Sequence, residues 1–177
     1  MPHKNTPPFP SKDKFIQFVK EIAPDANVVS VMLFGQLHRV SHQLTQIAEK
    51  RLEATGLTLP QFRLLMNLMH CERHSHSDGM MPSELSERQN ITRNTISALI
   101  SSLEANGYIS RELHGTDRRK FLIRLTPKGR KILQAQMATH FEYLGQCFDT
   151  LGVKERQTLH DLLNRLNDGL SSKVKTD

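Results

Sequence analysis

The chain has 177 residues, 37% of them hydrophobic and 24% charged, and a formal net charge of +6 at pH 7. This size and composition suit one domain with appended arms and enough apolar material for a core. They exclude an integral membrane protein, since the apolar stretch 28–34 is soon followed by polar residues, and the N-terminus lacks the apolar core of a secretory signal. Cys71 and Cys147 form no C-x-x-C pair or disulfide framework, so we expect a cytoplasmic protein with reduced thiols.

The positive charge is concentrated in one segment. Residues 91–131 hold nine Lys or Arg and three acidic residues, so this segment has a net charge of +6 and the remainder of the chain is neutral. Such a concentration is typical of a surface that binds a polyanion.

The N-terminal third is expected to be helical after an arm. The first 12 residues contain four of the eight prolines, and a short amphipathic helix ending at Pro24 completes an N-terminal arm over 1–27. Apolar residues then recur on one helical face, and Gly56 ends this segment, so 28–56 is expected to be a first long dimerisation helix.

The next segment, 57–126, is expected to form one folded module. Thr58 and Pro60 mark the start of a helix. Its expected buried stripe consists of Phe62, Leu65, Met66 and Met69. The polar sequence "HCERHSHSDGM" over 70–80 predicts a loop.

Residues 82–106 have the pattern of a helix-turn-helix. Pro82 and Ser83 open a short helix, residues 90–92 turn the chain, and Thr92 can cap a second helix that runs to Asn106. The residues of the second helix expected to face inward are Ile96, Leu99, Ile100 and Leu103.

A β-hairpin over 107–126 and two helices over 127–172 complete the pattern. "YISREL" and "KFLIRLT" flank "HGTD", with Ile109, Leu122 or Ile123, and Leu125 pointing inward. Thr126 and Pro127 start a helix, and a leucine stripe marks the last helix. The sequence thus predicts a mainly α fold with a small β-hairpin wing, in which a winged helix-turn-helix is flanked by N- and C-terminal dimerisation helices.

The second helix and the wing are the candidate DNA-binding elements. Polar side chains at a helix N-terminus suit phosphates and base edges, although they are also explained as a solvent-exposed face with a helix cap. Arginines at the wing tip favour DNA, because they suit a narrow minor groove, and Asp117 can hold one of them in a single rotamer. The predicted DNA-binding residues are Ser83, Thr92, Arg93, Asn94, Thr95, Ser97, Arg118, Arg119 and Lys120.

The segment 81–129, "MPSELSERQNITRNTISALISSLEANGYISRELHGTDRRKFLIRLTPKG", resembles the MarR family (multiple antibiotic resistance regulators), and the likeness extends over about 28–170. The wing pattern of that family is matched by Arg111, Asp117, Arg119, Leu125, Thr126 and Gly129. The resemblance implies a transcription regulator that is an intertwined homodimer on double-stranded DNA. It also implies that Arg119 is the wing arginine and that Asp117 orients it.

Effector control is a further implication of the resemblance. Family members respond to small phenolic or aromatic acids in a crevice between the dimer helices and the DNA-binding leg. The candidates to line it are His38, His42, Met66 and His70, although each is also explained as an ordinary core or polar residue.

The residues give less support to other functions. His70, Cys71, His74, His76 and Asp78 could hold a metal in a metal-responsive regulator, but their spacing matches no known closed site and a polar loop explains them. No catalytic or nucleotide-binding motif is present, so we expect neither an enzyme nor a cofactor. A winged-helix module that binds an acidic protein partner is the remaining alternative.

Overall fold

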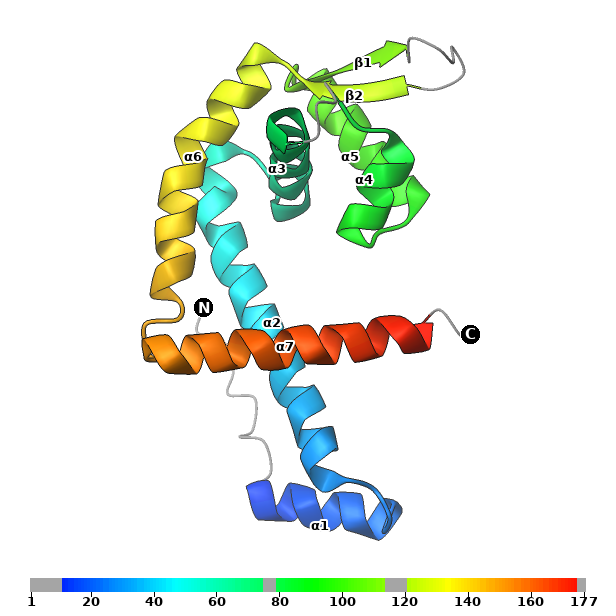
Figure 1. The fold of residues 1–177 in the computed structure, drawn as a ribbon, viewed down its shortest axis with the longest axis vertical. Helices are drawn as coiled ribbons and strands as arrows, with labels where there is room; N and C mark the ends of the chain where they lie inside the picture. Colours follow the sequence, from blue (N-terminus) through cyan, green and yellow to red (C-terminus); the bar gives the residue numbers. More distant parts are fainter. Residues whose placement is uncertain (1–10, 75–78, 114–120, 175–177) are drawn as a thin grey trace, which may run out of the picture. The chain divides into compact units, whose positions relative to one another are not determined.

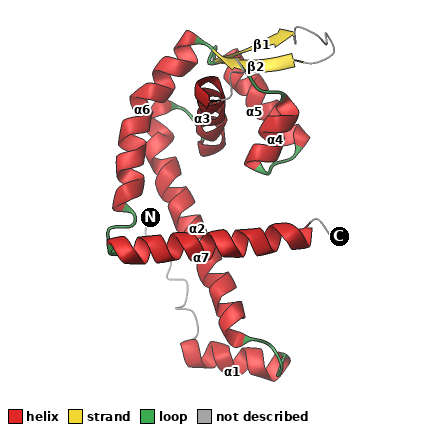
Figure 2. Cartoon of the chain, viewed as in Figure 1, coloured by secondary structure: helices red, strands yellow, loops and turns green. Residues whose placement is uncertain are grey.

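The computed structural model describes residues 11–74, 79–113 and 121–174. The described chain is mostly helical with one two-stranded antiparallel hairpin, which confirms the expected fold class (Figures 1 and 2). In chain order the elements are α1 (Lys12–Ile22), α2 (Val28–Leu52), a 3-10 turn (Glu53–Thr55), α3 (Leu59–His74), α4 (Pro82–Gln89), α5 (Arg93–Ala105), β1 (Ile109–Leu113), β2 (Phe121–Leu125), α6 (Pro127–Gln146) and α7 (Val153–Val174).

The chain divides into two compact units, residues 1–46 and 47–177, and the boundary falls inside α2. The first unit contains α1 and the first part of α2. The Asn27 side chain caps α2 by accepting a hydrogen bond from the backbone N–H of Ser30 at 3.1 Å. Among the described residues of this unit only Val19 is buried, so its apolar residues find little cover within the unit.

In the second unit the core is centred on α3. This helix contacts α4, α5, α6 and β2. The sequence predicted one buried stripe along it, but Leu64, Leu68 and Cys71 are buried as well. The single-stripe prediction was too narrow because α3 is surrounded by other elements rather than lying at the surface.

The end of α3 also corrects the sequence analysis. Residues 70–74 are helical and do not belong to a loop. The helix continues because Cys71 is buried and Glu72 forms an ion pair with Arg130 of α6, with Oε2 and Nη2 2.9 Å apart. After the undescribed residues 75–78, Met80 pairs with Ile123 in an isolated antiparallel bridge.

Local signals position α5 and the two strands of the hairpin. Thr92 caps α5, and its Oγ1 accepts a hydrogen bond from the N–H of Thr95 at 3.2 Å. Gly107 follows α5 with a φ of +70°. In the hairpin Ile109 pairs with Leu125, and Ile123 is the residue of β2 that enters the core, whereas its neighbour Leu122 is half-buried.

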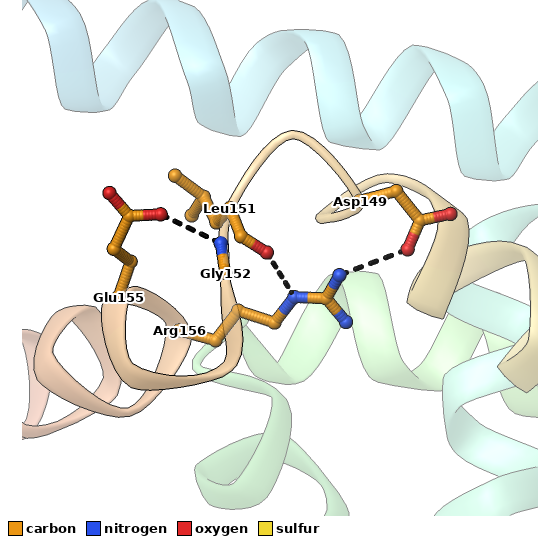
Figure 3. Close-up of polar contacts among 5 residues, drawn as sticks. All are labelled: Asp149, Leu151, Gly152, Glu155 and Arg156. Atoms are coloured by element: carbon orange, nitrogen blue, oxygen red, sulfur yellow. Dashed lines mark hydrogen bonds and ion pairs between the residues drawn. The ribbon is translucent and has the colours of Figure 1, made fainter.

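Polar contacts fix the junction of α6 and α7 (Figure 3). Glu155 accepts a hydrogen bond from the N–H of Gly152 at 2.7 Å, which caps the start of α7. The Arg156 guanidinium donates to the carbonyl of Leu151 at 2.9 Å and to Asp149 at 3.0 Å. Beyond this junction α7 exposes the apolar side chains Leu162, Leu163, Leu166 and Leu170.

Candidate nucleic-acid interface

The core orients α5 so that its N-terminal half offers a polar face to solvent. Ile96, Ile100 and Leu103 anchor the helix, each no more than 2% exposed. The side chains on the other side are exposed, namely Arg93, Asn94, Thr95 and Ser97, and so are Thr92 and Ser83. The structure therefore brings the predicted residues of the helix-turn-helix to the surface at a helix N-terminus, where the backbone dipole favours an anion.

A contact that the sequence analysis missed ties α5 to α3. Gln61 is buried, and its Nε2 donates to the Ser102 hydroxyl of α5 at 2.9 Å. Its Oε1 accepts from the N–H of Thr58 at 2.9 Å, so the same side chain caps α3. The Thr-x-x-Gln spacing of a capping box indicates the contact of Gln61 with Thr58 in the sequence. No sequence pattern indicates its contact with Ser102.

The base of the wing is held by arginines. Arg111 of β1 forms an ion pair with Glu104 of α5 at 2.9 Å and donates to the Ser101 hydroxyl at 3.2 Å. Arg124 of β2 pairs with Glu112 of β1 at 3.1 Å. Arg111, a residue of the matched wing pattern, therefore anchors β1 to α5.

These contacts divide the described basic residues of 91–131 into two groups. Arg111, Arg124 and Arg130 form ion pairs within the fold, and Lys128 donates to the carbonyl of Asn106 at 2.8 Å. Arg93 and Lys131 are exposed. The remaining three, Arg118, Arg119 and Lys120, lie outside the described residues, as does Asp117. The net charge of the segment thus overstates the charge that its described residues offer to a polyanion.

A close backbone approach joins the hairpin to α6. Gly129 lies so near Tyr108 that a Cβ at this position would be 1.9 Å from the Tyr108 carbonyl oxygen. Thr126 caps α6 by accepting from the N–H of Gly129 at 3.0 Å, and its hydroxyl donates to the carbonyl of Gly107 at 2.7 Å. The glycine of the wing pattern is therefore required by packing.

The four predicted effector residues lie in two places. His38 and His42 line a groove of about 810 Å³ in the first unit. Met66 packs against the core of the second unit, and His70 stacks on His74 with ring centroids 4.4 Å apart. The residues that line the groove include neither Met66 nor His70.

The predicted metal ligands do not form a site within the described part of the chain. No group of three or more His, Cys, Asp or Glu residues there could hold a metal ion. The Sγ of Cys71 lies 3.7 Å from the carbonyl oxygen of Gly79, to which it donates. His76 and Asp78 fall outside the described residues.

A histidine of α6 contacts the core helix. The ring of His140 packs against that of Phe62 with centroids 4.7 Å apart. Burial lowers the pKa of His140 below its ordinary value, and the positive charge of Arg63 lowers it further. The neutral ring is therefore favoured between α3 and α6.

Comparison with known proteins defines the class of the protein. The family model described as transcriptional regulator SarA/Rot matches residues 46–136, just over half of the chain. The HTH-type transcriptional repressor YetL of Bacillus subtilis is 29% identical over 160 residues, which cover 90% of this chain and 93% of YetL.

Solved structures share the fold. AbsC, a MarR family transcriptional regulator from Streptomyces coelicolor, superposes with a TM-score of 0.72 at 24% identity, over 83% of this chain and 97% of AbsC. Sco3205, a MarR family regulator from the same organism solved in complex with DNA, gives a TM-score of 0.71 at 22% identity, over 82% of this chain and 89% of Sco3205.

The fold and these relatives define a winged helix-turn-helix transcriptional regulator, and they confirm that the protein is not an enzyme. More closely, the chain belongs to the SarA/Rot family of transcriptional regulators and has the MarR-type fold, which confirms the resemblance drawn from its sequence. Within the residues that the structure describes, no helix is both long enough and apolar enough to cross a bilayer.

Proposed function

We propose that this regulator binds double-stranded DNA by placing α5 in the major groove and the wing against the neighbouring minor groove. The observation that carries the proposal is the exposed polar face of α5, which begins at the Thr92 cap and is held by the core on its opposite side. Arg93 and Asn94 can address guanine and adenine edges, and Thr95 and Ser97 suit phosphates or thymine methyl groups. The complex of the related fold Sco3205 with DNA supports this assignment.

The wing tip completes the proposed interface. Arg118, Arg119 and Lys120 would lie against the DNA backbone or in the minor groove, with Asp117 orienting Arg119. Ser83, at the start of α4, is exposed and suits a phosphate contact.

We further propose that the protein acts as a homodimer. Its long helices α2 and α7 expose apolar stripes, of which Leu33, Leu37 and Val40 on α2 are 39–52% exposed. Exposed apolar stripes on helices of this length suit pairing across a two-fold axis. Two copies would then place their α5 helices in successive major grooves about 34 Å apart, on a pseudo-palindromic operator.

As a cytoplasmic regulator the dimer would be controlled by a small-molecule effector. A ligand that binds one leg spacing better than another shifts the dimer toward that spacing, and so changes its affinity for the operator. We propose repression that is relieved by the effector, in line with the description of YetL as a repressor.

Selection of bound duplexes from a random pool tests the proposed function. The expected result is an inverted repeat whose half-sites are separated by about one helical turn, 10–10.5 base pairs. Recovery of unrelated duplexes with no common sequence would contradict sequence-specific binding, and a single unrepeated half-site would contradict the dimer.

A further inference from the structure

A groove opens between α1 and the first part of α2, wholly within the first unit. It has a volume of about 810 Å³ and is lined from α1 by Lys12 and Phe15. Its lining on α2 extends from Val31 to His42, a span of twelve residues and therefore about 16 Å along the helix axis. The size is that of a pocket for a small organic molecule, and the length suits an elongated one.

The groove lies on the opposite side of α2 from the apolar stripe assigned to the dimer. That stripe contains Leu33, Leu37, Val40 and Leu44, whereas the middle row of the groove consists of Val31, Gly35, His38 and His42. Phe34 and Gln36, which also line the groove, lie between the two rows. The two sets have the same spacing and are offset by two residues, which is about 200° around an α-helix. A second copy packed on the leucine stripe therefore leaves the middle row of the groove open.

Apolar and basic side chains are separated along the groove. The turn between α1 and α2, residues 23–27, lies beyond one end of the groove. Val31 and Met32 lie on the part of α2 nearest this turn, and His38, Arg39 and His42 lie farther from it. On α1 Phe15 is likewise nearer the turn than Lys12. Both helices thus place apolar groups toward the end nearest the turn and nitrogen-bearing groups toward the other end.

The charge of the groove has one sign. Among the described residues that line it, none is acidic. The sequence has no Asp or Glu at all between Asp25 and Glu49, so α2 can supply no carboxylate along the groove. The apolar wall is in contact with water, since Val31 is 37% and Phe34 75% exposed. A molecule with an apolar body and an anionic head satisfies both surfaces.

We propose that the groove between α1 and α2 binds an elongated amphipathic carboxylate, with its chain toward the α1–α2 turn and its head group near Lys12 and His42. The chain covers the exposed Val31 and Phe34, and the carboxylate accepts hydrogen bonds from the basic side chains. Gly35 leaves space between the two ends, because a Cβ there would meet no atom within 4 Å.

Binding at this site does not require the proposed DNA function, but its role as an effector site rests on it. The two are therefore measured separately, with the full-length protein. If the protein binds decanoate but binds no DNA duplex, the proposed ligand site is supported and the proposed DNA-binding function is refuted. If the protein binds the selected duplexes but does not bind decanoate, the proposed function is supported and the ligand site is refuted. That result would indicate that a second copy fills the groove.

Calorimetric titration with three probes tests the ligand class. Sodium decanoate, used below its micelle concentration, is expected to bind at least tenfold more tightly than decyltrimethylammonium, which has the same chain and the opposite charge. It is also expected to bind at least tenfold more tightly than benzoate, which is too short to fill the groove. Equal affinity for the cation would overturn the charge assignment, and equal affinity for benzoate would overturn the elongated shape.

Substitutions test the location. Gly35→Leu fills the groove and is expected to weaken decanoate binding at least tenfold. Gly169→Leu is the matched control, because Gly169 also lies in a helix with open space around its Cβ position and does not line the groove. Lys12→Gln, an exposed change that leaves the helices intact, is expected to weaken binding roughly threefold. Unchanged affinity in both Gly35→Leu and Lys12→Gln would overturn the proposal.

Discussion

The helices α3 and α7 both carry apolar stripes, but their surroundings differ. α3 is covered by α4, α5, α6 and β2, and Leu64, Leu65 and Leu68 are 0% exposed. In α7, Leu162, Leu166 and Leu170 are 44–53% exposed. An apolar stripe therefore does not by itself say what covers it: α3 completes the core of one chain, whereas α7 needs a surface that its own unit does not supply.

The largest expected effect tests the covered helix. Leu65→Ala removes buried methyl groups from the centre of the core, and is expected to lower the free energy of unfolding by about 2–5 kcal/mol. Chemical denaturation at a fixed low protein concentration measures this loss. A loss below about 1 kcal/mol would mean that α3 is not the centre of the core.

The second prediction concerns the contact between the hairpin and α6. Gly129→Ala is expected to cost about 1–3 kcal/mol of stability, because the added methyl group meets the carbonyl of Tyr108 and the backbone must move. Gly145→Ala, in the same helix with open space around it, is the control and should be neutral or stabilising by up to about 1 kcal/mol. Thermal unfolding of both variants measures the two losses of stability. Equal losses would contradict the close approach of Gly129 to the Tyr108 carbonyl.

For the uncovered helix the expected effect is on association. Leu166→Ala should raise the dissociation constant of the proposed dimer about tenfold, because a leucine that is exposed in one chain becomes buried between two. Analytical ultracentrifugation over a dilution series measures it. A wild-type chain that sediments as a monomer at every concentration would contradict the role given to α7.

A smaller effect is expected where α3 positions α5. Ser102→Ala leaves the buried Nε2 of Gln61 without its acceptor, which should cost about 1 kcal/mol of stability. Ser97→Ala, an exposed serine of the same helix, is the control, expected to change stability by less than about 0.5 kcal/mol. Denaturant unfolding of both variants would show no difference if the Gln61 contact were unimportant.

The smallest effect is a pH dependence of the contact between α3 and α6. The pKa of His140 is lower in the folded protein than in the unfolded chain, so the unfolded chain binds more protons. The contribution of the neutral His140 ring to the free energy of unfolding is therefore fully present above the ordinary histidine pKa of 6.5. It is lost as the pH falls below that value toward the folded pKa. Denaturation at several pH values should show a shallower acid slope for His140→Gln than for the wild type, and an unchanged slope would exclude this histidine as the cause.

Features fixed by neighbouring residues could be predicted from the sequence. The Thr92 cap, the left-handed Gly107 and the Thr126–Pro127 helix start depend on local backbone chemistry, and the structure has each of them. The end of α3 could not be predicted, because its last turn is held by Arg130, 58 residues away from Glu72 in the chain.

In the candidate site, too, local features could be predicted from the sequence and long-range contacts could not. Helical spacing identified the exposed face of α5 correctly, because one side of the helix had to be apolar. The sequence did not show that several arginines serve the fold, because an ion pair such as Arg111–Glu104 depends on how β1 packs against α5. It likewise gave no sign of the bond from Gln61 to Ser102, which joins residues 41 positions apart.

Titration of a selected duplex over a series of salt concentrations tests the central claim most directly. If α5 and the wing of two copies contact several phosphates, the logarithm of the affinity should fall linearly with the logarithm of the salt concentration, with a slope of roughly −4 to −8. An affinity that does not change with salt, or no binding even in dilute buffer, would contradict the account.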